Sequence, residues 1–153
     1  MQNNAQSGSA AGKERQGTIQ IPIGYRETII TPRASRSVEA FWSFNAEKAG
    51  QSIVLPDGRC DIILRHNSLR SEPQVPVITG PAIRAYTVTY IEGDCWLGMR
   101  LRPDNGRLLW GRASHDAADA VLRGVDAVAF LPALQAINDN RLEMADLAAL
   151  LPA

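Results

Sequence analysis

The sequence contains only two histidines, His66 and His115, and this scarcity limits the chemistry that the chain can support. A transition-metal enzyme usually needs several histidines, together with a carboxylate, around one ion. The two histidines lie far apart, and neither has a second histidine two positions away. We therefore expect His66 in a loop and His115 near a helix start, both on the surface, and we expect no metal site.

The chain also lacks a basic excess, because 16 lysines and arginines are balanced by 16 aspartates and glutamates. A nucleic-acid-binding domain commonly carries surplus positive charge that neutralises phosphates. Direct DNA binding by these residues is therefore not expected, although a local basic face within the neutral total remains the alternative. No apolar run reaches the ~20 residues of a membrane-spanning helix, and no signal-peptide pattern is present. These absences predict a cytoplasmic protein with no membrane partner.

Two cysteines, Cys60 and Cys95, are too few for a disulfide framework and form no CxxC pair. We expect both to be small, partly buried core thiols in a reducing compartment. The sequence also contains no GxSxG nucleophile elbow and no phosphate-binding glycine loop. We therefore predict no catalytic residue, no cofactor and no enzymatic activity.

Short strand signals dominate the chain from about residue 18 to residue 101. The tetrapeptide Leu55-Pro56-Asp57-Gly58 lies between apolar runs at 52–55 and 61–64, and it favours a hairpin turn. In this interpretation Asp57 stabilises the turn, and Asp61 closes the hairpin through a hydrogen bond to the backbone. Both carboxylates are thus expected to be structural, and not an acid–base pair.

The clearest alternation lies in 86–101. Tyr86, Val88 and Tyr90 share one face of a strand, and Glu92-Gly93-Asp94 then turns the chain. In the next strand one face is apolar and the other mixed, with Leu97, Met99 and Leu101 opposite Trp96, Gly98 and Arg100. The pattern predicts that these two strands pair as an antiparallel hairpin.

Helical signals follow Pro103. Asp104 is a candidate cap for a short helix that Gly111 stops, and further helices are expected over 114–122, over 126–139 with a break at Pro132, and from 140 to the end. Strands followed by helices predict an α+β fold, with an antiparallel β barrel or roll and a helical C-terminal part. We divide the chain into a disordered tail at 1–17, a β-rich domain with C-terminal helices at 18–139, and a terminal helix at 140–153.

Four separated segments together resemble a known family. They are 38–42 (VEAFW), 54–63 (VLPDGRCDII), 79–81 (TGP) and 97–103 (LGMRLRP). Their order and spacing resemble the N-terminal domain of a subgroup of AraC-type bacterial transcription regulators, over about residues 25–138. The sequence departs from the family pattern at Leu101, where an aromatic is usual, and at Asp104-Asn105-Gly106, which replaces a tighter glycine-rich turn.

The resemblance implies a cupin-like, effector-sensing domain. In whole regulators of this kind a pair of helix-turn-helix units follows and binds DNA, and this chain lacks that part. The terminal helix would then be a linker toward the absent DNA-binding domain, so any contact with DNA would be made only through that domain.

Aromatic and basic residues on the expected strands are the candidate ligand-binding residues. Each aromatic could instead be core packing, and each arginine a solvated or ion-paired side chain. The set comprises Trp42, Arg59, Tyr86, Tyr90 and Arg100. We expect these aromatics, with Trp96 as a further possibility, to line a pocket for an unidentified small-molecule effector. An inward-facing Arg100 or Arg59 would grip an anionic effector.

Three alternatives remain open. The chain could be a stand-alone cupin-like small-molecule-binding protein, a metal-free cupin enzyme, or an interaction module whose barrel interior is filled by Trp42, Tyr86 and Tyr90. A homodimer is also possible, because the apolar positions of the last helix must pack on a preceding helix or on a second copy. Those positions are Leu142, Leu147, Leu150 and Leu151, and their expected contacts are Leu131, Leu134 and Ile137.

Overall fold

The computed structural model describes residues 21–111 and 116–137. The tail at 1–17, His115 and the terminal helix at 140–153 lie outside the described residues, so the expectations for them stay predictions. None of the helices in the described part has the length and apolar character needed to cross a membrane.

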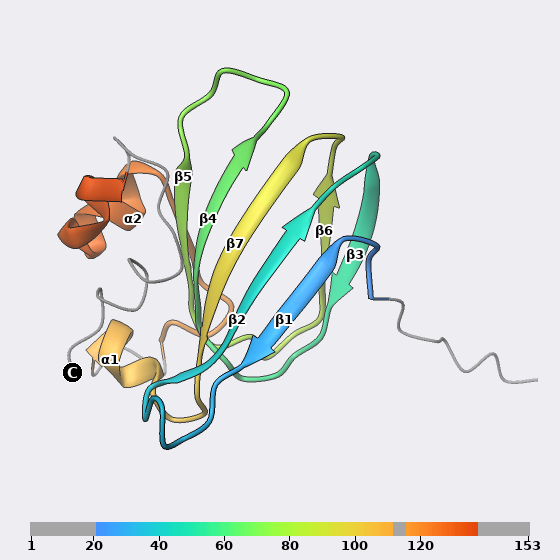
Figure 1. Cartoon of the computed structure of the whole chain (residues 1–153). Helices are drawn as coiled ribbons and strands as arrows, with labels where there is room; N and C mark the ends of the chain where they lie inside the picture. Colours follow the sequence, from blue (N-terminus) through green and yellow to red (C-terminus); the bar gives the residue numbers. More distant parts are fainter. Residues whose placement is uncertain (1–20, 112–115, 138–153) are drawn as a thin grey trace, which may run out of the picture.

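Eight strands form two antiparallel sheets (Figure 1). Their bounds are β1 Tyr25–Ile29, β2 Val38–Asn45, β3 Gly50–Val54, β4 Asp61–Asn67, β5 Val75–Thr79, β6 Tyr86–Tyr90, β7 Asp94–Leu101 and β8 Val121–Arg123. The larger sheet has the order β1-β2-β7-β4-β5-β8, and β3 and β6 form a separate two-stranded ribbon. The expected β-rich antiparallel fold is therefore present. The expected barrel is not, because β1 and β8 end the larger sheet without pairing to each other or to the ribbon.

Both predicted hairpins are wrong. β3 pairs with β6 and not with β4, while β7 lies between β2 and β4 and does not pair with β6. The turn chemistry itself is as expected: Gly58 has φ +68°, and the Arg59 backbone N–H donates to Asp57 Oδ1 at 3.0 Å. Each turn carries the chain from the ribbon to the larger sheet. A tight turn reverses the chain direction locally, but it does not determine which strands form hydrogen bonds with each other.

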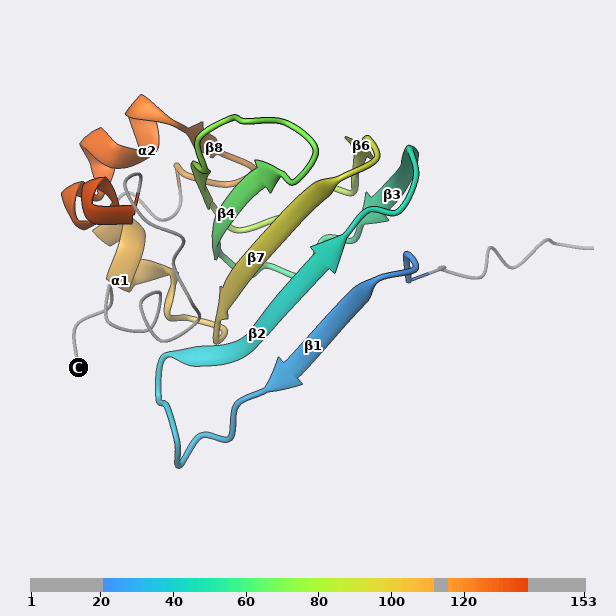
Figure 2. The same cartoon turned by 45° about the horizontal axis from the view of Figure 1, so that its top comes forward.

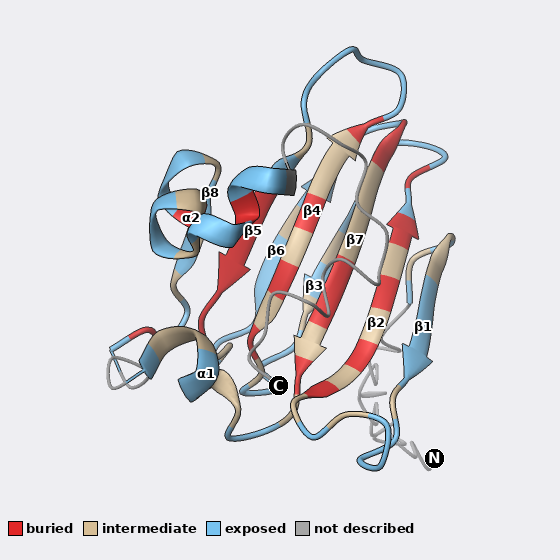
Figure 3. Ribbon diagram, turned by 60° about the vertical axis from the view of Figure 1, so that its left-hand side comes forward, coloured by how far each residue is buried: buried red, intermediate tan, exposed pale blue. Residues whose placement is uncertain are grey.

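Side-chain alternation along β7 gives the larger sheet two different faces, as predicted. Leu97, Met99 and Leu101 face the helices, and Met99 and Leu101 are fully buried. Trp96 and Arg100 face the β3–β6 ribbon. Figure 3 shows buried residues alternating with half-buried ones along β2 and β4, which matches strands with one face more deeply buried than the other.

A small helical layer covers one face of the larger sheet, and the ribbon lies on the other (Figure 2). The layer consists of α1 Gly106–Trp110, α2 Val125–Phe130 and the 3₁₀ helix η2 Pro132–Ile137. Leu134 of η2 is completely buried in the same cluster as Ile62, Leu64 and Ile78 of the sheet. Burial of each such side chain stabilises the fold by about 1.5–3 kcal/mol.

A bulge near the start of β2 changes which face of the sheet its side chains point to. The register with β7 shifts between Val38 and Ala40. Val38 consequently packs with the helix-side core, whereas Trp42, an even number of residues later, packs in a second cluster on the ribbon side. Without the extra residue, strict alternation would place both side chains on one face.

Several helix predictions need correction. The expected helix over 114–122 is wrong within the described residues, because 121–123 forms β8, which pairs with β5, and Asp119 has a left-handed φ of +57°. The unpaired edge of β5 outweighs the helix propensity of the alanines. Asp104 is not the cap of α1: it has φ +68°, and Asn105 is the N-cap residue. The stop at Gly111 and the break near Pro132 are confirmed, while His66 lies on β4 and not in a loop.

Candidate ligand cavity

A cavity of about 830 Å³ lies between the larger sheet and the β3–β6 ribbon. Small-molecule sites typically enclose about 300–1,000 Å³. All five candidate ligand-binding residues line this one space, namely Trp42, Arg59, Tyr86, Tyr90 and Arg100. They come from β2, the β3–β4 connection, β6 and β7, so the sheet topology brings together residues that are far apart in the sequence.

The wall of the cavity on the β1–β2 side is aromatic. Tyr25 stacks on Trp42 with ring centroids 5.9 Å apart. Phe44 makes edge-on contacts with Tyr90 at 4.8 Å and with Trp96 at 6.0 Å. These rings pack on one another and also line the cavity, so the core-packing and pocket-lining interpretations both apply. The interaction-module alternative requires that Trp42, Tyr86 and Tyr90 fill the interior. They line a cavity of about 830 Å³ and do not fill it.

Trp42 is held in place by Gly98, its partner on the neighbouring strand. A Cβ atom added at Gly98 would lie 2.0 Å from Cε2 of the Trp42 ring. The indole therefore lies directly over the Gly98 backbone, in space that any side chain would occupy. This close approach orients the indole N–H toward β4.

The indole N–H donates to a carboxylate. Trp42 Nε1 lies 3.0 Å from Asp61 Oδ1, and the Asp61 backbone N–H donates to Thr79 Oγ1 at 2.9 Å. Asp61 and Ile63 point into the cavity, while Ile62 and Leu64 between and beyond them point into the helix-side core. The prediction that Asp61 only closes a hairpin is wrong, because that hairpin does not exist and the Asp61 side chain lines the site.

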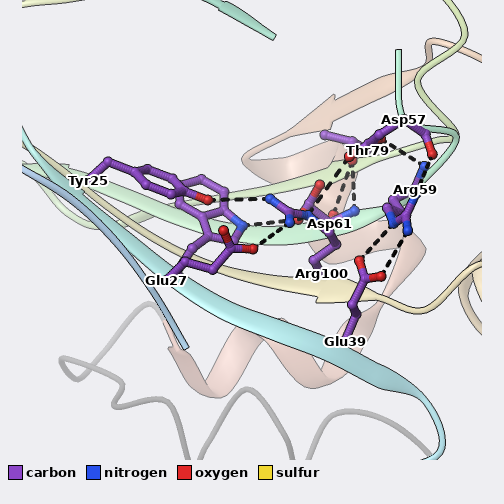
Figure 4. Close-up of polar contacts among 9 residues, drawn as sticks. Tyr25, Glu27, Glu39, Asp57, Arg59, Asp61, Thr79 and Arg100 are labelled. Atoms are coloured by element: carbon purple, nitrogen blue, oxygen red, sulfur yellow. Dashed lines mark hydrogen bonds and ion pairs between the residues drawn. The ribbon is translucent and has the colours of Figure 1, made fainter. Parts of the chain in front are cut away.

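Arg100 lies among several carboxylates (Figure 4). Its Nη1 is 2.6 Å from Glu27 Oε1, and its Nη2 donates to the Tyr25 hydroxyl at 3.4 Å. Its Nε lies 3.9 Å from both Asp61 Oδ1 and Asp57 Oδ2 and makes no hydrogen bond to the described residues. Burial alone would lower the pKa of Arg100, but Asp61 and the Tyr25 hydrogen bond outweigh it and raise this pKa.

Burial raises the pKa of Asp61 to about 6. The hydrogen bond from Trp42 and the charge of Arg100 act in the opposite direction, and they do not compensate for the loss of water around the carboxylate. The negative charges of Asp57 and Glu39 add to the increase. Asp61 is therefore a carboxyl group that changes charge close to neutral pH, in the lining of an aromatic cavity.

Arg59 is engaged by a different carboxylate. Its Nε and Nη2 donate to the two carboxylate oxygens of Glu39 at 2.7 and 2.9 Å, and Nη1 donates to the Asp57 carbonyl oxygen. This two-point contact lowers the pKa of Glu39. Arg59 thus lines the cavity, but its guanidinium is already paired with Glu39.

The described part of the chain also contains potential metal ligands and two thiols. No group of three or more His, Cys, Asp and Glu side chains there is arranged to hold a metal ion. Cys60 is a buried free thiol, and burial raises its pKa to about 11, so it is protonated at neutral pH. Cys95 is free and half-buried. Cys60 is more deeply buried than expected, whereas Cys95 is partly buried as expected but belongs to neither core cluster.

The family comparison covers most of this site. A family model described as a domain of unknown function, DUF6597, matches residues 31–123, which is more than half of the chain. The chain belongs to the DUF6597 family. The DUF6597 match runs from before β2 to the end of β8, so it includes Trp42, Asp61 and Arg100, whereas Tyr25 and Glu27 on β1 precede it. No curated protein and no solved structure matched this DUF6597 chain.

Proposed function

We propose that this DUF6597 domain is the effector-sensing part of an AraC-type transcription regulator, whose DNA-binding part lies outside this sequence. The observation that carries the proposal is that all five residues expected to bind ligand line one cavity of about 830 Å³. Aromatic walls with a few polar groups at one end are typical of small-molecule sites. In this proposal the effector occupies the space between the larger sheet and the β3–β6 ribbon.

The geometry of β4 supplies a route from effector to regulator. Asp61 and Ile63 face the cavity, and Ile62 and Leu64 face the core that contains Leu134 of η2. An effector that shifts this strand therefore alters the packing beneath η2, the last described element before the C-terminal segment. An effector acts only if it binds one arrangement better than another, so ligand contacts on β4 are the part of the site that transmits the signal.

A ligand screen with a matched pair of variants tests the binding half of the proposal. Val88 points from β6 into the cavity, and Thr89 is exposed and does not line it. Compounds are screened by thermal shift on the 153-residue chain, then on Val88→Trp and Thr89→Trp. We expect hits that stabilise the parent chain and Thr89→Trp but stabilise Val88→Trp less, because the indole at position 88 projects into the cavity and takes up space that the ligand needs. Hits that stabilise Val88→Trp equally would place binding elsewhere and contradict the proposal.

The gene sequence that follows Ala153 tests the regulator half. A helix-turn-helix segment of about 100 residues in the same reading frame is expected, which is enough for one more small domain. A stop codon directly after Ala153, combined with cavity-specific hits, would instead support the stand-alone small-molecule-binding protein.

A further inference from the structure

We propose that the cavity binds a positively charged ligand, an organic amine with an apolar body, whose ammonium group contacts Asp61 while its body packs on the aromatic wall. This inference rests on the proposed function and adds the chemical class of the effector. It replaces the expectation that Arg59 or Arg100 grips an anion.

The first observation is an excess of carboxylates around Arg100 in the cavity lining. Arg100 is surrounded by Glu27 at 2.6 Å and by Asp57 and Asp61 at 3.9 Å each. One guanidinium cannot neutralise three carboxylates. Arg59, the other cation nearby, does not contribute to the balance, because Glu39 holds it through two hydrogen bonds. The local charge is therefore negative when all of these groups are ionised.

Further along the lining, the remaining charges do not reverse this sign. Asp119 and Arg84 both line the cavity and offset each other in charge. Asp119 Oδ1 accepts hydrogen bonds from the backbone N–H groups of Ile83 and Arg84 at 2.8 and 3.2 Å, so it has a structural role in this connection. An anionic ligand would have to displace Glu27 or Glu39 from an arginine, whereas a cation meets carboxylates that are not fully paired.

The second observation is that Asp61 has one oxygen left for a ligand. Oδ1 accepts from the Trp42 indole, and Oδ2 accepts no hydrogen bond from the described residues. The side chain is 19% exposed and lines the cavity, so a ligand can reach it. The cation closest to Asp61 is Arg100, whose Nε is 3.9 Å from Oδ1, and Arg100 is shared with Glu27 and Asp57. An ammonium group at hydrogen-bond distance from Oδ2 supplies a closer positive charge.

The third observation is the aromatic wall. The faces of aromatic rings attract cations, and sites for organic ammonium ions are commonly lined by them. Trp42 lies beside Asp61, with Tyr25 stacked on it. Trp96 of the same wall already accepts a cation, since the Arg65 guanidinium carbon lies 5.2 Å from its ring centroid. A carboxylate beside an aromatic wall matches an amine with an apolar substituent.

Protonation of Asp61 makes the affinity depend on pH. The charged and titratable groups around it are Tyr25 and Glu27 of β1, Glu39 of β2, Asp57 and Arg59 of the β3–β4 connection, Tyr86 of β6 and Arg100 of β7. A bound cation favours the ionised carboxylate, so the affinity falls as pH drops through about 6. Between pH 7.5 and pH 5.0 the loss is about tenfold when the cation requires ionised Asp61.

The experiment compares three similar probes of different charge, 2-phenylethylamine, 2-phenylethanol and phenylacetate. Binding to the 153-residue chain is measured by tryptophan fluorescence and by the NMR signals of the indole N–H groups. At pH 7.5 we expect the amine to bind about tenfold more tightly than the alcohol, and phenylacetate most weakly. We expect the preference for the amine to disappear in Asp61→Asn. It should persist in Glu72→Gln, which removes a negative charge from an exposed ion pair with Arg70 outside the cavity.

Each other result has a defined meaning. If the alcohol or phenylacetate binds as tightly as the amine and Val88→Trp weakens that binding, the cation inference is overturned while the proposed function stands. If none of the probes binds, or if amine binding is unchanged in Val88→Trp, the inference is also overturned, and the wider ligand screen then decides the proposed function. Should Asp61→Asn not fold, the pH dependence of amine affinity in the parent chain decides, and an affinity that is unchanged between pH 7.5 and 5.0 refutes the role of Asp61.

Discussion

Replacing Asp61 by asparagine should stabilise the fold at neutral pH. The folded protein raises the pKa of Asp61 from 3.8 to about 6, because the carboxylate is buried with too little compensating charge. A pKa that is higher in the folded state means that the folded protein holds its proton more strongly than the unfolded chain does. The contribution of this group to stability is therefore full below pH 4 and is lost as pH rises through 6.

The magnitude follows from the shift. Each pKa unit corresponds to about 1.4 kcal/mol, so the ionised Asp61 side chain destabilises the fold by about 3 kcal/mol above pH 6. Asparagine has nearly the same shape, and its Oδ1 still accepts the Trp42 indole hydrogen bond. Arg100 keeps its ion pair with Glu27. Asp61→Asn removes the buried charge and its 3.9 Å ion pair with Arg100, and it leaves the hydrogen bonds of the neighbouring residues in place.

Urea unfolding of both chains, followed by circular dichroism from pH 4 to pH 8, measures the effect. The quantity of interest is the difference in the free energy of unfolding between the two chains, because other carboxylates titrate equally in both. We expect this difference to be near zero at pH 4 and to increase in favour of Asp61→Asn up to about 3 kcal/mol at pH 8. A difference that is independent of pH, or a variant that is less stable at pH 8, would refute the argument about burial.

Two further substitutions test the packing on either face of the larger sheet. Gly98→Ala should lower the free energy of unfolding by at least about 1–3 kcal/mol and change the tryptophan fluorescence, because its Cβ would lie 2.0 Å from the Trp42 ring; a stable variant with unchanged fluorescence would contradict the close approach. Leu134→Ala should cost about 2–5 kcal/mol, because this side chain is completely buried under the sheet. The control Leu108→Ala, at a position 41% exposed on α1, should change stability by less than about 0.5 kcal/mol in the same urea titration. Equal effects of the two leucine substitutions would contradict the assigned core.

Much of the fold follows from local patterns in the sequence. The two-residue alternation identifies β7 and β6 and assigns Met99 and Arg100 to opposite faces. The turn residues Asp57 and Gly58 adopt the expected geometry. Strand pairing does not follow, because each short strand has similar hydrogen-bonding groups along both edges and only long-range packing selects its partner. The hairpin between 86–90 and 94–101 was therefore predicted wrongly although both strands exist.

The candidate site likewise contains residues that local patterns predict and contacts that only the tertiary structure creates. Trp42, Tyr90 and Arg100 were predicted from residue type and strand position, and they meet in one cavity. Asp61 was missed because its neighbourhood was interpreted as a hairpin. Its alternation with Ile62 and Leu64 contained part of the signal, since a carboxylate one position out of phase with buried aliphatic residues faces the other side of the sheet. Alternation does not distinguish solvent from a cavity on that side. The pairing of Arg59 with Glu39 was not predictable either, because the two residues lie 20 positions apart in the sequence and meet only through tertiary structure.

The β3–β6 ribbon has a consequence for how the protein folds and opens. Its paired residues are more than 30 positions apart, and each of its strands has one hydrogen-bonded neighbour, whereas β2, β4, β5 and β7 each have two. Long-range pairing of this kind loses much chain entropy before contacts compensate for it, so the ribbon closes late in folding and is among the first elements to open. The cavity therefore exists only while the ribbon is closed. A molecule held between the ribbon and the larger sheet acts as a non-covalent cross-link, and its binding energy adds directly to the energy needed to open that wall.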